Sequence, residues 1–332
     1  MACVFLLACS GQTSSSLQEG SDRPKDDSSS ACCMATVETL ETPSPPAAAM
    51  ANPAGAGPLA GHRICIDPGH DSYWVAGASG YNSAGVVPRH PIDGVPLYEH
   101  ELTLSVATRL EALSIADGAA VCLTRNHREE GGTLVIAPYD FTGDGRVRTA
   151  GQAIEDEPER SQPRIDAANG FGAEVLLSIH FNGAGDRSIR GTETYYSDTG
   201  DRALDDRRLA ASVQASLLSE MAASGYPGLD RGIKSDRYQR YSPEEMRRLL
   251  TNNAATLRAH GQDAANCPDC YRLFTLGNNP MSLTPGQYVG VLVEVEFLSN
   301  PAAVDGFIMR PDSFDIVARG LRNGVRQYFG AE

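Results

Sequence analysis

The sequence predicts an α/β protein with three layers, a mostly parallel sheet of about six strands with helices on both faces. Two observations carry this prediction. Short apolar runs alternate along the chain with longer segments whose apolar residues recur every three or four positions, which is the pattern of strands and amphipathic helices in turn. The run 174–179 is apolar along most of its length, as in a strand that is buried on both faces.

The expected strands follow one another after residue 60. The first, 63–66, is a short apolar run that stops at the turn sequence Asp67-Pro68-Gly69. The segment 191–197 is rich in the β-branched and aromatic residues that strands favour. Together with the run 174–179, we expect strands at 63–66, 119–123, 191–197, 271–276 and 291–297.

Four helices are expected between and after these strands. Residues 99–113 carry apolar side chains at steps of three and four, and we predict further helices over 161–171 and 204–223. The last helix, 312–329, has an apolar stripe formed by Phe314, Val317, Leu321, Val325 and Tyr328. Residues 126–160 and 236–268 lack such a period, so we predict two insertions: a long loop, and a polar segment with a charged helical piece near 243–250.

The first sixty residues differ in composition from the rest of the chain. Residues 10–60 are dominated by Ser, Ala, Pro, Gly and Asp, and such a segment cannot bury enough apolar surface to fold. We therefore predict a disordered tether at 10–60 and a folded domain over 61–332 that contains both insertions.

Residues 1–9 end in Leu6-Leu7-Ala8-Cys9, which resembles the lipobox of bacterial lipoproteins. This resemblance implies a signal segment, acylation of Cys9 as a lipid anchor to the membrane, and export as an outer-membrane lipoprotein on the periplasmic side. The alternative is an unstructured N-terminus with an incidental cysteine, because no Lys or Arg precedes the apolar patch.

The net charge of the chain limits the kinds of partner it can bind. With 28 Lys+Arg against 42 Asp+Glu, the formal net charge is −14, which argues against nucleic acid as a partner because that partner requires a basic surface. No apolar run reaches the ~18–20 residues of a membrane-spanning helix.

Four cysteines fall in the predicted domain. Cys65 and Cys122 lie in expected strands, so a disulfide can form if these strands are neighbours. Cys267 and Cys270 form a single CxxC, for which a local disulfide or two free thiols is a better interpretation than half of a zinc site. Residues 140–145 begin like a calcium loop, but its twelfth position is Gly151, so we predict an acidic turn.

Four polar side chains lie where strands end or a helix begins. His70 follows the first strand, His180 closes the strand 174–179, Glu294 lies in the last strand, and Glu99 opens the first helix. Ligands bind beyond the carboxyl ends of parallel strands, so these side chains could converge on one metal-binding crevice. Taken singly, each is better explained as a turn or capping residue than as a metal ligand.

The motifs around these residues occur in a defined order: 66–70 (Ile-Asp-Pro-Gly-His), 99–104 (Glu-His-Glu-Leu-Thr-Leu), 178–182 (Ser-Ile-His-Phe-Asn) and 291–301 (Val-Leu-Val-Glu-Val-Glu-Phe-Leu-Ser-Asn-Pro). With supporting matches at Arg164, 191–194 and 231–234, the chain resembles the zinc-dependent N-acetylmuramoyl-L-alanine amidases of type 3 over about 63–330. These enzymes cleave bacterial peptidoglycan at the amide between N-acetylmuramic acid and L-alanine.

The resemblance implies a role for each motif residue. His70, Glu99 and His180 correspond to the Zn²⁺ ligands, Glu294 to the catalytic carboxylate and Asn182 to a substrate-binding residue. Two imidazoles and one carboxylate leave zinc a fourth position for water. The resemblance further implies peptidoglycan as substrate, an activator protein as partner, and autoinhibition by a helix over the zinc, for which 236–268 is the candidate.

Several alternatives stay open at this point. Glu99, His100 and Glu101 are all metal-competent, although the motif favours Glu99. Glu296 replaces a small residue of the family, and strand alternation predicts that it shares a face with Glu294. The rival functions are another zinc peptidase or amidase on the same scaffold and a non-catalytic wall-binding lipoprotein.

Overall fold

The computed structural model describes residues 56–70, 73–74, 81–82, 97–124, 127–130, 133–136, 162–237, 273–279, 282 and 284–331. All of them belong to one compact unit, Pro45–Glu332. Cys9, the CxxC of Cys267 and Cys270, the acidic turn at 140–145 and most of 236–268 lie outside the described residues. Leu59 is fully buried, so the folded unit begins slightly before the expected boundary at 61.

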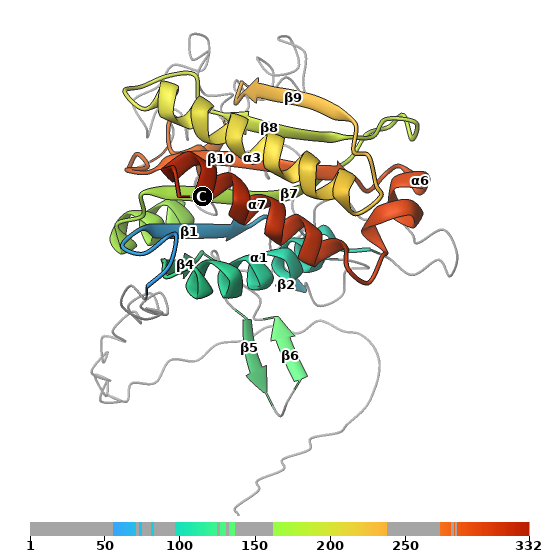
Figure 1. Ribbon diagram of the computed structural model, residues 1–332, viewed down its shortest axis with the longest axis horizontal. Helices are drawn as coiled ribbons and strands as arrows, with labels where there is room; N and C mark the ends of the chain where they lie inside the picture. Colours follow the sequence, from blue (N-terminus) through green and yellow to red (C-terminus); the bar gives the residue numbers. More distant parts are fainter. Residues whose placement is uncertain are drawn as a thin grey trace, which may run out of the picture. The chain divides into compact units, whose positions relative to one another are not determined.

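A six-stranded sheet forms the middle of the fold (Figure 1). Its strands lie in the order β4 (Ala120–Leu123), β1 (Arg63–Pro68), β7 (Val175–Asn182), β10 (Val289–Phe297), β8 (Thr192–Tyr196) and β9 (Asp230–Ser235). Neighbouring strands are parallel except for the antiparallel pair of β10 and β8. The prediction of a mostly parallel sheet of about six strands is confirmed.

Helices cover both faces of this sheet, which confirms the three layers. Figure 1 shows α1 (Glu99–Ala116), α3 (Ala203–Ala223) and α7 (Ser313–Phe329) on one face, and the core beneath them includes Ile66, Leu177 and Val293. The helix over 162–171 packs on the other face through Ile165, Ala168 and Phe171. Because β7 and β10 are sandwiched between these two layers, their sequences are apolar on both sides.

One expectation about local structure was wrong, and one predicted insertion contains strands that were not expected. Residues 274–276, expected in a strand, form a 3-10 turn (η2, Phe274–Leu276), and the sixth strand is β9 instead. β9 is an edge strand with no fully buried residue and a single large apolar side chain, Ile233, so it shows no hydrophobic pattern. The predicted long loop at 126–160 contains a hairpin of β5 (His127–Glu130) and β6 (Thr133–Ile136).

The remaining elements are short. β2 (Tyr73–Trp74) pairs with β3 (Tyr81–Asn82) before α1. After β10, the chain forms the helical turns α6 (Pro301–Ala303) and η3 (Val304–Ile308), with Asn300 capping α6 through a bond from the Ala303 N–H. α7 ends at Gly330, whose φ of 69° is the left-handed conformation of a helix C-cap. Among the described residues, no helix is long and apolar enough to cross a membrane.

A disulfide joins Cys65 and Cys122. The two residues lie opposite each other in the parallel register of β1 and β4, with their Cα atoms 4.6 Å apart. Both are buried beneath the helix over 162–171. The disulfide was expected only if the two strands are neighbours, and β1 and β4 are neighbours in the sheet.

Candidate metal centre and active site

His70, Glu99 and His180 converge at one end of the sheet, with their candidate ligand atoms all within 4.8 Å of one another. Glu99 Oε1 lies 3.2 Å from His70 Nε2 and 3.2 Å from His180 Nδ1. The two imidazole rings are in edge-to-face contact, with centroids 4.8 Å apart. His100 and Glu101, the other acidic or imidazole candidates at the start of α1, are not part of this cluster.

The fold accounts for the convergence. His70 follows β1 and His180 lies near the end of the neighbouring parallel strand β7, so both come from carboxyl ends of strands. Glu99 is the first residue of α1 and is held by the Phe181 N–H, which donates to its Oε1 at 2.9 Å. A side chain at Gly69 would place its Cβ 2.4 Å from the His180 ring. Only glycine therefore lets the two strands bring these histidines together.

Arg164 fixes the backbone that carries His70. His70 has a φ of 59°, an uncommon left-handed conformation for a residue with a side chain. The Arg164 guanidinium donates to the carbonyl oxygens of Pro68 (2.9 Å) and His70 (2.8 Å) and pairs with the Asp67 carboxylate at 2.5 Å. These bonds hold His70 in a conformation that the backbone alone would disfavour.

Asp67 is the buried counter-charge of that arrangement. Its carboxylate accepts a bond from the Ser178 hydroxyl at 2.6 Å and another from the Thr124 hydroxyl. Burial would raise the pKa of Asp67, but the charge of Arg164 and these hydrogen bonds outweigh burial and lower it. Asp67 therefore stays ionised and keeps Arg164 in place.

The two histidines keep Glu99 ionised, as Arg164 does for Asp67. Burial would raise the pKa of Glu99, but the charge of His70 and the hydrogen bonds from both imidazoles lower it. Burial would lower the pKa of His180, and the hydrogen bond with Glu99 together with the charges of Glu294 and Glu99 raises it. An ionised carboxylate between two imidazoles is a donor set that suits a divalent cation.

Glu294 lies beside this cluster. It is opposite His180 in the register of β10 and β7. Burial is the main reason that its pKa is raised to about 8; the charge of His180 opposes this rise, and those of Glu99 and Glu193 add to it. Its Oε2 atom is buried and has no hydrogen-bond partner among the described residues. A carboxyl group of this kind can accept or release a proton near neutral pH.

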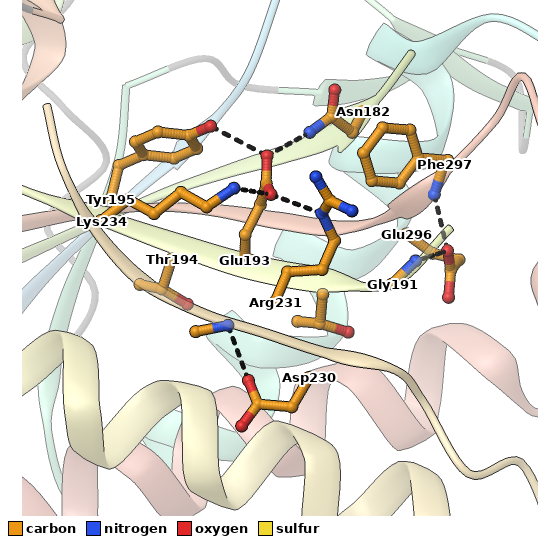
Figure 2. Close-up of polar contacts among 12 residues, drawn as sticks. Asn182, Gly191, Glu193, Thr194, Tyr195, Asp230, Arg231, Lys234, Glu296 and Phe297 are labelled. Carbon is orange, nitrogen blue, oxygen red and sulfur yellow. Dashed lines mark hydrogen bonds and ion pairs between the residues drawn. The ribbon is translucent and has the colours of Figure 1, made fainter. Parts of the chain in front are cut away.

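A second buried carboxylate, Glu193, lies on the next strand and is the centre of the network in Figure 2. Its Oε1 accepts bonds from Asn182 (2.7 Å) and Tyr195 (2.8 Å), and its Oε2 accepts bonds from Arg231 (2.7 Å) and Lys234. Burial would raise the pKa of Glu193, but these hydrogen bonds lower it.

Sequence reasoning missed the role of Glu193. The segments 191–194 and 231–234 were used only as support for the family resemblance, and no role was assigned to their individual residues. The available signal was an acidic residue within the β-branched and aromatic strand 191–197. Asn182, the expected substrate-binding residue, is a member of this network: its Nδ2 donates to Glu193 and its Oδ1 accepts the Gly183 N–H. Its role toward substrate stays a prediction.

Glu296 does not lie as strand alternation predicts. The register of β10 against β7 shifts between Glu294 and Phe297, and such an irregularity changes the face to which the following side chains point. The Glu296 carboxylate accepts bonds from the Gly191 N–H (2.5 Å) and the Tyr226 hydroxyl (2.9 Å). Tyr226 belongs to the core beneath α3 and α7. Glu296 is thus a structural carboxylate rather than a second one beside Glu294.

Comparison with known proteins agrees with this geometry. The family model of the N-acetylmuramoyl-L-alanine amidases of type 3 matches residues 64–327. The chain is 24% identical over 273 residues to the germination-specific N-acetylmuramoyl-L-alanine amidase of Bacillus subtilis, covering 82% of this chain and 81% of that protein. It is 27% identical over 197 residues to the N-acetylmuramoyl-L-alanine amidase LytC of the same organism, covering 59% of this chain but only 30% of LytC.

Among solved structures, the CwlD amidase of Clostridioides difficile, solved in complex with the GerS lipoprotein, has the same fold. The TM-score is 0.52 at 17% identity, and the match covers 82% of this chain and all of that chain. With a family model that spans most of its length, the chain belongs to the type 3 N-acetylmuramoyl-L-alanine amidases. The family, the α/β fold and the class of enzyme expected from the sequence motifs are confirmed.

Proposed function

We propose that this chain hydrolyses the amide bond between N-acetylmuramic acid and L-alanine in bacterial peptidoglycan, with Zn²⁺ held by His70, Glu99 and His180. The observation that carries the proposal is the position of Glu294, a half-buried residue opposite His180 whose Oε2 atom is buried and whose pKa is raised to about 8. A hydrolase needs such a proton carrier beside its ligand cluster, whereas a wall-binding protein does not.

The donor set supports zinc. Two imidazole nitrogens and one carboxylate oxygen, all within 4.8 Å, are a ligand set of catalytic zinc sites that keep one position open. When bound there, zinc would supply a Lewis acid that polarises the scissile carbonyl and lowers the pKa of water. Phe181 and Arg164 preorganise the set, since they hold Glu99 and the His70 backbone before any metal binds.

The proton path follows from the side chains. Glu294 Oε2 takes a proton from the attacking water as the new C–O bond forms at the lactyl carbonyl. The same oxygen then gives a proton to the L-alanine nitrogen as the C–N bond breaks. A pKa near neutrality suits both transfers. The products are the lactyl carboxylate on the glycan and a peptide with a free L-alanine amino terminus.

Mass analysis of digested peptidoglycan tests this proposal. Purified peptidoglycan should release peptides with an N-terminal L-alanine and leave the glycan strands intact. Chelation of the metal should abolish release, and added Zn²⁺ should restore it. Cleavage within the peptide would instead identify the rival peptidase, and binding without release would identify the rival wall-binding protein.

We further propose that the protein is exported and anchored through Cys9. The Leu6-Leu7-Ala8-Cys9 sequence and the Cys65–Cys122 disulfide support this proposal, because disulfides persist in oxidising compartments. The wild type should partition with membranes and Cys9→Ala should be released; equal partitioning of both would contradict the anchor. A protein partner is a further proposal, supported by the complex in which the CwlD amidase was solved.

A further inference from the structure

Arg231 and Lys234 form a cationic pair beside the active site. Both extend from β9 to the same oxygen atom, Oε2 of Glu193 (Figure 2). The Glu193 side chain is only 3% exposed, whereas that of Arg231 is 31% exposed and that of Lys234 is 35% exposed. The carboxylate is therefore an internal anchor, and the two cations reach from it toward solvent.

The charges in this network do not balance. One carboxylate faces two cations, and the other contacts of Glu193 are the neutral groups of Asn182 and Tyr195. A guanidinium has five N–H donors and an ammonium three, and within the described part of the chain Glu193 is the only carboxylate in contact with either cation. Among its direct contacts the pair thus has more positive than negative charge and has unused donors, as an anion-binding site requires. Glu294, opposite Glu193 on β10, is a further acidic group that interacts electrostatically with Lys234.

The sheet places this pair in line with the reacting groups. His180, Glu294 and Glu193 lie opposite one another on the neighbouring strands β7, β10 and β8. All three face away from α3, since Thr192 and Thr194, on either side of Glu193, contact Met221 and Gln214 of α3. At about 4.8 Å between strands, Glu193 is about 10 Å from His180.

Charge complementarity selects the group that would bind there. The scissile amide joins a sugar derivative to a peptide. The sugar part is uncharged once its lactyl group is in the amide, whereas the peptide carries free carboxylates. About three residues of extended chain, at about 3.5 Å each, span the roughly 10 Å from the ligand cluster to the anchor of the pair.

We propose that Arg231 and Lys234, positioned by Glu193, bind a carboxylate of the stem peptide on the L-alanine side of the scissile amide. This inference rests on the proposed function and assigns the peptide side of its substrate to the β8–β9 edge of the sheet. Arg231 contributes a planar fork whose Cζ atom also lies over the Phe297 ring, 5.0 Å from its centroid, and Lys234 contributes a point charge.

A pair of matched substrates tests the proposal. N-acetylmuramoyl-L-alanyl-D-glutamyl-L-lysine is compared in two forms, one with its carboxylates free and one with all of them amidated. The wild type should favour the free acid by tenfold or more in kcat/KM. In Lys234→Gln and Arg231→Gln, this preference should fall toward one through a higher KM for the acid, with kcat changed less than KM.

The control is Arg208→Gln on α3, because Arg208 lies over Tyr328 on the opposite face of the sheet. It should keep the wild-type preference. Lys234→Arg should restore part of what Lys234→Gln loses, because it keeps the charge. Zinc content and circular dichroism show whether each variant is folded and loaded.

A binding measurement separates this inference from the proposed function. The released peptide, L-alanyl-D-glutamyl-L-lysine, should bind the zinc-loaded protein at least tenfold more tightly than its fully amidated form by calorimetry, and Lys234→Gln should remove the difference. If the wild type hydrolyses or binds acid and amide equally, the carboxylate site is wrong while the amidase function stands. If neither muramoyl peptide is hydrolysed but acid-selective binding persists, the proposed function fails and the site stands.

Discussion

Glu294 and Glu193 lie directly opposite each other in the antiparallel pair of β10 and β8, yet they have opposite electrostatic surroundings. Burial raises the pKa of Glu294 to about 8, whereas the hydrogen bonds from Lys234, Arg231 and Tyr195 overcome burial and lower the pKa of Glu193. Because the pKa values of these two adjacent carboxylates are shifted in opposite directions, one can transfer a proton while the other stays charged and holds the cations. Glu193 is thus a positioning residue, and Glu294 is the candidate for the chemistry.

The first prediction concerns the two carboxylates of β10. Glu294→Gln should retain zinc and lose at least ~10²-fold in kcat, which is the smaller end of what a positioned proton carrier contributes. Glu296→Gln should keep most of the activity of the folded enzyme and lose stability, because the bonds from Gly191, Tyr226 and Phe297 need acceptors in a buried site. Single-turnover rates, metal analysis and thermal unfolding measure these effects. An inactive Glu296→Gln together with an active Glu294→Gln would reverse the two assignments.

The second prediction concerns Arg164. Arg164→Lys cannot reach the Asp67 carboxylate and the carbonyls of Pro68 and His70 at once. His70 should then lose its fixed position, and the affinity for zinc should fall by roughly 10- to 100-fold, as for other residues that orient metal ligands. Titration of the apo-protein with Zn²⁺ against a competing chelator measures this. The matched control is Arg109→Lys, which affects an exposed ion pair with Asp315 and should leave zinc affinity at the wild-type value.

The third prediction concerns pH. Asp206 is buried and its carboxylate accepts the Gly290 N–H at 2.8 Å; burial, with smaller additions from Asp236 and Asp205, raises its pKa to about 7. In the unfolded chain the same group titrates near 3.8. Between about pH 4 and 7 the folded state therefore binds more protons than the unfolded state, and this group's contribution to stability declines as pH rises through that window.

Asp206→Asn should remove this decline, since the amide keeps an acceptor for Gly290 without ionising. Between pH 4 and pH 8 the ionisation of Asp206 should lower the unfolding free energy of the wild type, and the variant should not show this loss. The difference between the two proteins over this range should be on the order of 2–4 kcal/mol, at about 1.4 kcal/mol per pKa unit. Urea unfolding at several pH values provides the measurement. Asp205→Asn, its exposed neighbour, should retain the wild-type slope; a variant Asp206→Asn with that same slope would contradict the assignment.

The fourth prediction concerns the contact between α3 and α7. A Cβ at Gly324 would lie 2.6 Å from the Val213 Cα, so the two helices approach as closely as a glycine permits. Gly324→Ala should destabilise the protein by about 1–3 kcal/mol, as overpacking does, despite the better helix propensity of alanine. Gly170→Ala, in the helix over 162–171, meets nothing within 4 Å and should stabilise by about 0.5–1 kcal/mol. Differential scanning calorimetry should show a lower unfolding temperature for Gly324→Ala and a higher one for Gly170→Ala. Equal shifts of the two variants would show that the contact between α3 and α7 can relax around the added methyl group.

Local sequence patterns were enough to predict the alternation of strands and helices and the side chains at the strand ends. Both depend on local properties, since burial imposes a period on each segment and strands of a parallel sheet end at one edge. For this reason the main strands, the four long helices and the convergence of His70, Glu99 and His180 could be predicted from the order of their motifs.

Which strands are neighbours, and where their register breaks, could be learned from the folded structure but not from local sequence patterns. β9 has no hydrophobic pattern because it is an edge strand, so its place beside β8 depends on pairing rather than on composition. The shift in β10 turns Glu296 toward Tyr226, although a regular strand would place it beside Glu294. The network of Glu193 with Arg231 and Lys234 requires residues that are 38 and 41 positions apart in the sequence to meet. Such contacts arise from the global packing of the chain, and the hydrophobic periodicity of a single segment does not predict them.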